Sequence, residues 1–499
     1  MWISVYRISQ SQIRRKVINN IKDYYVMKYL KEYNTVDEYI QDVSENPVNY
    51  PTLCTLKTTD TEKWKKKIFY RKIMTNQSNP EAMEIARNAG WVGQTDTFMT
   101  IDQAIAVTND SFNAANILVS DSSTPGGYRS LTFANLKHFD EFQFFVNVTK
   151  TTFTDTTYEE QAAKQGGFFG AYDLESITLP PSMMIIGNYC FRNSKLKEIT
   201  FPSTLKQVSV QAFAFCGELS HVNMNQGLNV IQNYAFAGSS IGYAQTSGIP
   251  GGTQLLPDTL TYIGHGAFSN IYDTYPGKFQ EILNLPRLML FGEEVFSNQF
   301  SPREIHIGER LQTLGNGADY TGQYNDVFWD MLETITIDEN NPNFKAVNNI
   351  VYSKDGTICY GGADYGLSKQ NVVKIAEGVT KLMAGSFRDF MAKMDNGAYT
   401  QVCPWYDKNN EVCQYIVFPS TLTYIGDRSG QYAANGLKVV CLATTPPTRE
   451  ATGNGSQWYM VSGYYVPAES VDAYKAAAGW SSYKKKIYAI TDEILAAIA

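Results

Sequence analysis

Four histidines and two pairs of adjacent glutamates are the residues of this sequence best suited to acid–base chemistry. The histidines are His138, His221, His265 and His306. None stands in the H-E-x-x-H, H-x-x-E-H or G-x-S-x-G patterns that bind zinc or activate a serine. Adjacent carboxylates, as at Glu159-Glu160 and Glu293-Glu294, would point to opposite faces of a strand. Acids from different segments could hydrolyse a glycoside, but no spacing singles out such a pair. We therefore expect no catalytic residue, and a polysaccharide hydrolase is kept only as an alternative.

Seven cysteines offer a second kind of chemistry, as metal ligands, nucleophiles or disulfides. They are scattered without any C-x-x-C pair: Cys54, Cys190, Cys216, Cys359, Cys403, Cys413 and Cys441. An odd, unclustered set favours small buried apolar residues over a disulfide framework or a zinc site. Only Cys403 and Cys413 lie close enough in one loop for a pairing to be considered. The glycine pairs at residues 251–252 and 361–362 have no helix start behind them to hold a phosphate, and no cofactor is expected.

The composition fits a globular, β-rich chain. Of 499 residues, 43% are hydrophobic and 18% are charged, which excludes a wholly disordered chain, collagen and a low-complexity polymer. The 33 tyrosines and 37 glycines suit turn-rich β structure. No apolar run of about 18 residues occurs, so we expect no membrane-spanning helix. The first twenty residues lack the apolar core and the cleavage site of a secretory signal.

Charge is distributed unevenly along the chain. Residues 1–72 contain 14 Lys/Arg and 8 Asp/Glu, a net charge of +6, whereas the whole chain carries −7. The densest basic cluster contains Lys63, Lys65, Lys66, Lys67 and Arg71. This cluster is either a docking surface for an acidic partner or the solvated edge of a small domain. The acidic remainder of the chain argues against nucleic acid as the main partner.

A repeated pattern fills the second half of the chain. Three similar segments begin at Leu174, Leu196 and Leu219, which are 22 and 23 residues apart. They read LESITLPPSMMIIGNYCF, LKEITFPSTLKQVSVQAF and LSHVNMNQGLNVIQNYAF. Further copies with insertions follow towards residue 426. Self-similarity at a period of 20–50 residues is typical of stacked repeat architectures, so it overrides a count of domains from length alone.

Each unit of the pattern predicts one coil of a solenoid. In L-x-x-I-x-[LF]-P the last apolar residues alternate with polar ones, which is the pattern of a short half-buried strand. Proline then ends the strand because it has no N–H for a further backbone hydrogen bond. An Ile-Gly step then gives a second buried anchor and a turn. An Ala-Phe step would place a large ring between successive coils. One unit cannot bury its own apolar face, but a stack of units can. The pattern predicts a β-rich α/β solenoid with short parallel strands.

The repeat closely resembles the BspA-like leucine-rich repeats of gut bacteria and their phages. Ile335–Tyr360 is similar to the interruption of that family, a D-x-x-N-P loop followed by a β-hairpin, and Asp355-Gly356 suits a hairpin turn on its own terms. Val439–Thr448 and Tyr464–Tyr483 resemble the closing module found after such arrays. The resemblance covers roughly residues 95–490 and implies a leucine-rich repeat array associated with adhesion at cell surfaces.

Upstream of the repeats the resemblance continues with one departure. Met99–Asp110 and Phe139–Thr149 are similar to the segment that often precedes such arrays. Relatives often carry an aspartate-rich, calcium-type loop before it, but the stretch here, GWVGQTDTFMTID, lacks the alternating Asp/Asn ligands. We therefore expect no calcium there. Apolar residues at helical spacing predict helices over Val17–Tyr33 and over Pro80–Ala89, the second with Asn79 as N-cap.

These features divide the chain into four predicted regions. They are a small, mostly helical, basic docking domain at residues 1–90, a pre-repeat segment at 91–170, the repeats with insertions at 171–436 and a C-terminal cap at 437–499.

Outward positions of the predicted strands form one candidate binding surface. The residues chosen as contacts are Lys197, His221, Asn223, His306 and Tyr415. Their expected neighbours on the same face are Glu175, Thr178, Glu198, Thr200, Glu304, Glu333 and Thr336. Such positions are either solvated ladder positions or contacts with a partner, since exposed Tyr and His can stack on sugars or side chains. The insertions at residues 242–252, 271–278, 316–326 and 391–411 form a second candidate surface, because binding often resides in loops on a rigid array. Neutral insertion is the alternative for these loops.

The sequence thus predicts a non-enzymatic binding or adhesion protein that presents a repeat scaffold to a protein or glycan. Without an export signal, a phage virion-associated attachment or decoration protein is favoured, with residues 1–90 as a dock onto other virion proteins. The alternative is a bacterial cell-surface or secreted adhesin.

Overall fold

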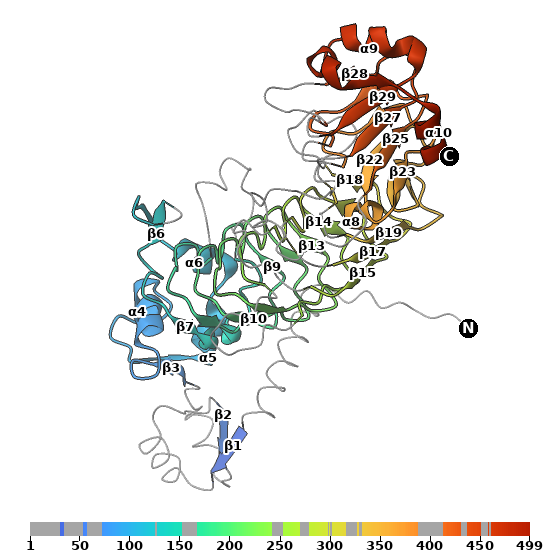
Figure 1. The fold of residues 1–499 in the computed structure, drawn as a ribbon. Helices are drawn as coiled ribbons and strands as arrows, with labels where there is room; N and C mark the ends of the chain where they lie inside the picture. The colour runs from blue at the N-terminus through green and yellow to red at the C-terminus, as the bar shows by residue number, and fades with distance from the viewer. Residues whose placement is uncertain are drawn as a thin grey trace, which may run out of the picture. The chain divides into compact units, whose positions relative to one another are not determined.

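The computed structural model divides into two compact units, Met1–Leu205 and Lys206–Ala499. Figure 1 colours the chain from blue at its N-terminus to red at its C-terminus. This division falls inside the predicted array at residues 171–436. The structure describes residues 30–33, 53–56, 72–124, 127–151, 167–241, 253–269, 279–297, 299, 302–315, 327–328, 332–387, 413–430, 437–450, 458 and 461–499. None of the helices in these ranges is long and apolar enough to cross a membrane.

The first described elements of the first unit are two paired strands. One of them lies where the sequence predicts a helix. β1 (Leu30–Tyr33) pairs in parallel with β2 (Leu53–Leu56). The helix predicted over Val17–Tyr33 is therefore wrong at its last four residues, because pairing with a distant strand overrides a local apolar period. The remainder of that helix lies outside the described residues. Within residues 1–90, the described part contains three strands and one helix. Most of this region lies outside the described residues, so the mostly helical docking domain stays a prediction.

The helix predicted after Asn79 is confirmed by α4 (Pro80–Asn88). The side chain of Asn79 accepts a hydrogen bond from Ala82 N at 3.1 Å, and Pro80 occupies the first turn, where a missing N–H costs nothing. β3 (Lys72–Thr75) and β4 (Phe98–Thr100) form an antiparallel pair. Two short helices follow, α5 (Ile101–Ala106) and α6 (Asn109–Ala114), and each begins with a threonine capping box.

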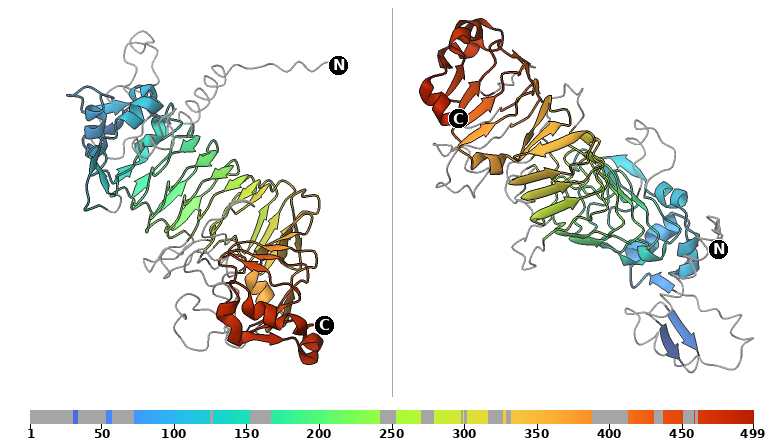
Figure 2. Two further views of the ribbon diagram at one scale, coloured as in Figure 1. Left: turned by 90° about the horizontal axis from the view of Figure 1, so that it is seen from above. Right: turned by 90° about the vertical axis from the view of Figure 1, so that its right-hand side faces the viewer.

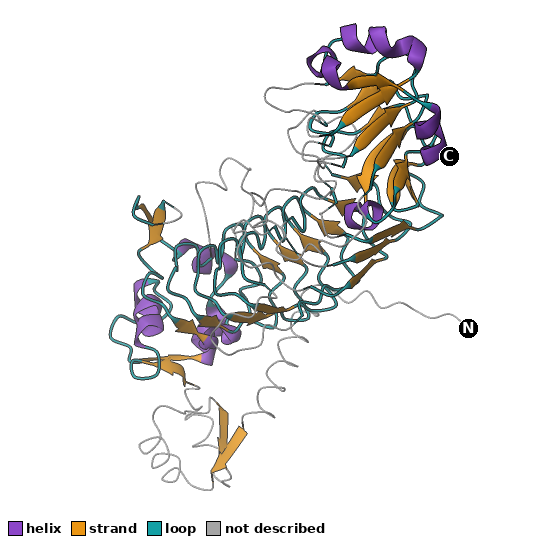
Figure 3. Ribbon diagram, viewed as in Figure 1, coloured by secondary structure: helices purple, strands orange, loops and turns teal. Residues whose placement is uncertain are grey.

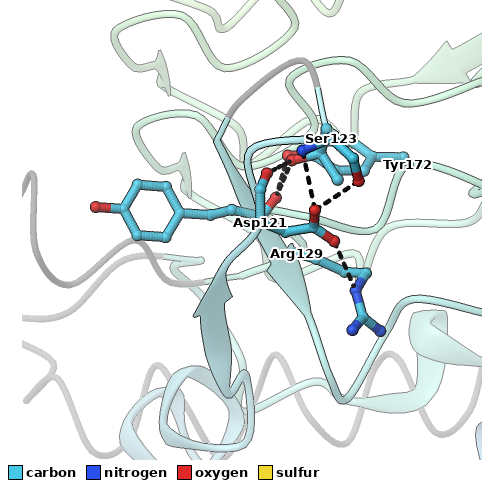
Figure 4. A network of polar contacts seen from close by, with 6 residues as sticks. Asp121, Ser123, Arg129 and Tyr172 are labelled. Carbon is cyan, nitrogen blue, oxygen red and sulfur yellow. Dashed lines mark hydrogen bonds and ion pairs between the residues drawn. The ribbon is translucent and has the colours of Figure 1, made fainter.

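A braced hairpin follows these helices. β5 (Leu118–Ser120) and β6 (Tyr128–Ser130) pair antiparallel, and Asp121 begins the connection between them. The Asp121 carboxylate accepts from Ser123 N at 3.0 Å and lies 3.2 Å from Arg129 Nε (Figure 4). Hydrogen bonds from Ser123, and then the charge of Arg129, lower the pKa of Asp121. The Tyr172 hydroxyl donates to Tyr128 O, which ties the start of β6 to the beginning of the repeats.

Aromatic rings fill the core of the first unit. The ring of Phe112 lies 4.9 Å from Phe142 and 5.3 Å from Phe168, and Phe168 stacks on Phe191 at 5.3 Å. The backbone elements around this core are β7 (His138–Phe139), η1 (Asp140–Phe144), β8 (Ser176–Ile177), β9 (Ile185–Ile186) and β10 (Glu198–Thr200). β7 pairs in parallel with β8, which begins the repeat pattern.

In the second unit the repeats form coils with two rows of parallel strands (Figures 2 and 3). The strand that opens a coil is β12 (His221–Asn223), β15 (Ile282–Leu285), β17 (Glu304–Ile307) or β19 (Thr334–Ile337). The Ile-Gly step, expected as an anchor and a turn, forms a second short strand. These strands are β11 (Gln207–Val208), β13 (Val230–Ile231), β14 (Tyr262–Ile263), β16 (Leu290–Phe291) and β18 (Thr313–Leu314). The predicted solenoid of short parallel strands is confirmed.

The phenylalanines that close the coils stack as predicted. The rings of Phe213, Phe236, Phe268 and Phe296 follow one another at 5.2, 5.3 and 5.5 Å, with interplanar angles of 2°, 2° and 7°. Two residues before each ring the backbone is left-handed: the φ values are 52° at Gln211, 56° at Tyr234, 56° at Gly266 and 51° at Glu294. Such a conformation costs a non-glycine residue about 1–2 kcal/mol. Backbone hydrogen bonds to the next coil, such as Tyr234 N to His265 O at 2.8 Å, offset that cost.

Glycine in the Ile-Gly step is required by the close approach of coils. A Cβ on Gly264 would lie 2.5 Å from Asn233 N, and one on Gly292 would lie 2.5 Å from His265 N. Both contacts are with backbone of the preceding coil, which cannot move without breaking the ladder.

The predicted interruption of the array is a three-stranded antiparallel meander. It contains β20 (Phe344–Val347), β21 (Ile350–Ser353) and β22 (Ile358–Gly362). Asn348 and Asn349 connect the first two strands with φ values of 50° and 64°, the conformation of a two-residue hairpin turn. At the second turn Gly356 has φ 82°, and Asp355 accepts from Thr357 N at 3.0 Å. The hairpin expected at Asp355-Gly356 is confirmed.

Asn341 fixes the loop that leads into this meander. The side chain is fully buried, and its Nδ2 lies 3.1 Å from Leu311 O and 3.2 Å from Glu309 O on the preceding coil. Its Oδ1 accepts from Asn343 N and Phe344 N at 2.9 and 2.8 Å. The amide thus satisfies backbone groups on both sides, which an apolar residue could not do.

Parallel coils resume after the meander and continue into the closing module. One sheet contains β23 (Val372–Lys374), β25 (Tyr415–Phe418), β27 (Lys438–Cys441), β29 (Gly463–Val466) and β30 (Ile487–Ala489). The other extends from β22 through β24 (Lys381–Leu382), β26 (Tyr424–Ile425) and β28 (Thr448–Arg449). The helices are α8 (Asp364–Ser368), η2 (Ala468–Ser470), α9 (Val471–Ala476), η3 (Ser481–Lys486) and α10 (Asp492–Ile498).

Candidate functional site

Strands β15, β17 and β19 present a row of mostly hydrogen-bonding side chains on their outward face. Their registers align Asn284, His306 and Thr336 in one row and Ile282, Glu304 and Thr334 in the next. The alternate residues Leu283, Ile305 and Ile335 are buried, and side chains alternate along a strand, so the six project from the same face. We name these six residues the ladder face. Ile282, at 48% exposed, is its apolar member.

His306 is the centre of the ladder face. Its Nδ1 lies 2.7 Å from Thr336 Oγ1, and its Nε2 lies 3.8 Å from Glu304 Oε2. A hydroxyl, an imidazole and a carboxylate in this order could activate a nucleophile in a closed site. Here the imidazole is 37% exposed on an open strand face, where water solvates all three groups. The arrangement is better suited to hydrogen bonding with a partner.

A cluster of charged and aromatic side chains lies at one end of the ladder face. Arg303 Nη1 donates to Glu333 Oε1, and Lys369 Nζ lies 3.1 Å from Glu333 Oε2. Both cations contact the ring of Tyr365: the Lys369 Nζ is 4.2 Å and the Arg303 Cζ 5.2 Å from its centroid. We name these four residues the Arg303 cluster.

Helix α8 positions two members of the Arg303 cluster by direct backbone contact. Gly366 N donates to Leu332 O at 3.1 Å. A Cβ on Gly366 would lie 2.0 Å from Glu333 O, so only glycine permits this approach. The helix therefore holds Tyr365 and Lys369 against the start of β19.

The other predicted contact residues have different surroundings. Lys197, in the first unit, is exposed and forms an ion pair with Glu175 at 2.8 Å. His221 and Asn223 flank the buried Val222 on β12, so both occupy the predicted outward positions. Asn223 is exposed, whereas His221 is half-buried, and no described group lies within hydrogen-bond distance of its Nδ1. Of the five predicted contacts, His306 is the one the structure places on the ladder face.

The prediction that Tyr415 is an exposed contact residue is wrong. It points outward from β25, but only 6% of its surface is exposed. Its apolar neighbours are Val417, Val440 and two residues of α10, Ile494 and Ile498. Lys438 completes its surroundings, with Nζ 3.2 Å from the Tyr415 hydroxyl. The helix covers this part of the sheet, which a strand-by-strand interpretation of the sequence could not foresee. Tyr415 therefore cannot be a surface contact in this structure.

Several predicted sites lie outside the described residues. These are the docking residues Lys63, Lys65, Lys66, Lys67 and Arg71, and the four insertions at residues 242–252, 271–278, 316–326 and 391–411. Their roles stay predictions.

The remaining histidines and the cysteines take structural positions. His138 Nδ1 lies 3.0 Å from Ser176 Oγ, and His265 Nδ1 lies 3.4 Å from the buried carboxylate of Glu293. Burial raises the pKa of Cys413 to about 11 and that of Cys359 to about 12, so neither thiol is a nucleophile at neutral pH. The described cysteines are buried free thiols, as predicted: Cys190, Cys216, Cys359, Cys413 and Cys441. The pairing considered for Cys413 is not formed, and Cys403 lies outside the described residues.

Comparison with known families agrees with the coil geometry. The model of the BspA type leucine-rich repeat region matches residues 140–248 and 253–340, with six copies. The matched residues form a BspA type leucine-rich repeat region. The later parallel coils of β23–β30 lie beyond the matched residues. No curated protein matches the sequence.

The comparison with solved structures finds leucine-rich repeat proteins at low identity. A leucine-rich cell surface protein from Faecalibacterium prausnitzii is 14% identical, with 77% of this chain and 95% of that chain covered and a TM-score of 0.40. A leucine-rich repeat protein from Eubacterium ventriosum is 16% identical, with 64% and 73% covered and a TM-score of 0.33. The pneumococcal vaccine antigen PcpA is 14% identical, with 75% and 97% covered and a TM-score of 0.33.

Sequence reasoning placed His306, Glu304, Thr336 and Glu333 on one outward face but missed the rest of this site. Arg303, Tyr365 and Lys369 were not selected, because Tyr365 and Lys369 follow the meander and are more than 60 residues from Arg303 in the chain. Ile282 was not selected either, although the repeat copy ILNLPRLMLFGEEVF begins with it. One signal was available: EIHI at β17 and TITI at β19 alternate in polarity, which is typical of a strand with one open face.

Proposed function

We propose that this leucine-rich repeat protein is a non-enzymatic binding protein of the adhesion type, and that the ladder face with the Arg303 cluster holds a protein partner. The observation that carries the proposal is the alignment of six outward side chains on three paired strands, with His306 at the centre. A rigid array of coils keeps these groups at fixed spacing, so a partner gains many modest contacts without ordering the surface.

The chemistry of the surface favours a protein. Non-obligate protein interfaces are mixed, with an apolar anchor, hydrogen-bonding groups and charges at the rim. Ile282 supplies the exposed apolar group, Asn284 and Thr336 supply hydrogen bonds, and the Arg303 cluster supplies a charged and aromatic end. Arg and Tyr are also the residues that most often dominate binding energy at such interfaces.

The test is binding of the labelled, purified full chain to intact gut bacterial cells and to cultured colonic epithelial cells, each with and without proteinase K treatment. We expect binding to at least one surface, loss after proteinase K, and about a tenfold or larger loss for the double variant Asn284→Ala/His306→Ala. Lys354→Ala, an exposed lysine on the meander, is the matched control. The proposal would be contradicted if the double variant bound as well as Lys354→Ala, or if binding survived proteinase K.

A catalytic role would be detected as turnover of a polysaccharide. Measurable turnover of polysaccharide that is abolished by Glu304→Gln or His306→Ala would replace binding by hydrolysis. We expect no turnover, since the three groups are solvated rather than enclosed.

We further propose a phage particle as the place of action, with a bacterial cell surface as the alternative. The support is charge: residues 1–72 carry +6 on a chain of −7, which suits a basic dock onto an acidic particle surface. Mass spectrometry of purified particles and of cell envelopes distinguishes the two. Enrichment in the envelope fraction alone would reject the virion location.

A further inference from the structure

The closing module carries an exposed pair of tyrosines on the outward face of its last two strands. Tyr465 on β29 is in register with Tyr488 on β30. The ring centroids are 5.6 Å apart and the rings are inclined by 33°. Tyr488 is 46% exposed, while Tyr465 is half-buried against the apolar cluster beneath α10. One ring is thus anchored and the other extends the aromatic surface into solvent.

Gly463 allows both rings to lie against the strand. A Cβ at this position would be 3.2 Å from a ring carbon of Tyr465 and 3.2 Å from one of Tyr488. A side chain there would be in tight contact with both rings, which would have to shift by a few tenths of an ångström. The Tyr488 hydroxyl donates to Lys485 O at 3.1 Å, which fixes the orientation of the outer ring. The pair is therefore a preformed platform of two rings.

Three lysines lie on the strand next to the platform or on the segment that leads into it. Lys438 is in register with Gly463 and is partly exposed, although its Nζ also contacts the Tyr415 hydroxyl. Lys484 and Lys485 are exposed on η3, which leads directly into β30. The platform thus combines apolar ring faces, hydroxyl groups and positive charge.

We propose that the Tyr465–Tyr488 pair is a glycan-binding site for a carboxylated pyranose. A pyranose presents an apolar C–H face that stacks on an aromatic ring, and a rim of hydroxyls that hydrogen-bonds to tyrosine and lysine. A carboxylate on that ring gains from Lys438, Lys484 and Lys485. Tyrosine provides such amphipathic contact at low entropic cost, and the fixed rings reduce the cost further. This site lies apart from the ladder face on β15–β19 and does not depend on it.

The test measures retention of the purified full chain on immobilised hyaluronan and polysialic acid, with the neutral β-glucan laminarin as the comparison. We expect retention on at least one carboxylated chain, weaker retention on laminarin, and lower affinity at high salt. Tyr488→Ala should lower affinity about tenfold, the loss expected when one stacked ring is removed. Tyr488→Phe should keep most of the affinity, because the ring remains.

Tyr128→Ala is the matched control, since Tyr128 is 42% exposed on β6 and its ring neighbour, Phe169 at 6.5 Å, is buried and offers no second exposed ring. Thermal melting of each variant checks that folding is unchanged. The proposal is overturned if neither carboxylated chain is retained, if laminarin is retained equally, or if Tyr488→Ala and Tyr128→Ala behave alike. Asn284→Ala/His306→Ala should leave glycan retention unaltered, so failure here and failure of the proposed protein-binding face are separate results.

Discussion

The outward faces of two parallel sheets in the same unit have opposite chemistry. On β15–β17–β19 the outward residues include Asn284, His306 and Thr336, and the face is open. On β23–β25–β27 they include Tyr415, Val417 and Val440, and α10 covers them through Ile494 and Ile498. Figure 1 shows α10 beside β23 and β25. The backbone of the two sheets is equivalent, so the side chains at alternate positions decide which face remains available to a partner.

The difference is visible in the strand sequences once the two sheets are compared. EIHI and TITI alternate, whereas YIVF at β25 and VVC within β27 are continuous apolar runs, the pattern of strands buried on both faces. The repeat motif alone treats these strands as equivalent, which is why it selects both His306 and Tyr415 as contacts.

Tyr415→Ala should show the largest effect. Removing a buried aromatic ring costs about 3–5 kcal/mol, and the unfolding free energy of the Lys206–Ala499 unit should fall by that amount. Thr336→Ala, at an outward position of the open face, should change it by less than about 0.5 kcal/mol. Urea denaturation of both variants measures this contrast. Equal stability of the two variants would mean that the two faces do not differ as described.

Ile494→Ala should have the next largest effect, by loosening the cover itself. Loss of a buried isoleucine side chain costs about 2–4 kcal/mol, and the apolar face beneath α10 would become accessible. Leu495→Ala is the control on the same helix, because Leu495 is exposed. Binding of a fluorescent apolar dye and hydrogen exchange at β25 report the exposure. Dye binding that is no greater for Ile494→Ala than for Leu495→Ala would show that α10 is not the cover.

Asn341→Ala should destabilise the coil next to the open face, because it removes hydrogen bonds to buried backbone groups. The variant leaves carbonyl groups such as Leu311 O and the amide of Phe344 buried without their partner, at a cost of about 1–3 kcal/mol. Asn340→Ala, an exposed neighbour, serves as the control. We expect faster hydrogen exchange at Phe344 only in Asn341→Ala. Unchanged exchange would show that the loop is held by other contacts.

The smallest effect concerns Asp355, in the meander between the two sheets. Hydrogen bonds from Ser353 and then Thr357 lower the pKa of this carboxyl below the ordinary value of about 3.9. A lowered folded-state pKa stabilises the turn above the unfolded value, and this contribution is lost as pH falls through the folded value. The Thr357 amide resonance, followed by NMR from pH 5 to pH 2, should move with a midpoint below 3.9. A midpoint at or above that value would contradict the hydrogen-bonded turn.

Much of the fold could be predicted because the repeat is local and its physics is simple. Alternating residues, a proline stop and an Ala-Phe step fix one coil, and Phe213, Phe236 and Phe268 stack as the spacing requires. The helix after Asn79 and the hairpin at Asp355 also depend on short-range chemistry, a side-chain cap and a turn. The strand over Leu30–Tyr33 was missed because its partner lies at residues 53–56, beyond the reach of a local period.

The candidate site could be predicted only in part. The alternation of polar and apolar residues places His306 outward, and the structure confirms this position. The Arg303 cluster joins residues from β17, β19 and α8, and no local pattern brings them together. The prediction that Tyr415 is exposed failed because residues nearly 80 positions later in the chain fold back over it.

By itself the sequence determined the stacked coils, their inward residues and the places where the array is interrupted, because each depends on interactions within one repeat or with its neighbour. Only the tertiary structure decided which outward residues reach solvent. Exposure depends on what else packs against a face, and for α10, for α8 and for the Tyr465–Tyr488 pair the packing partners are distant in sequence.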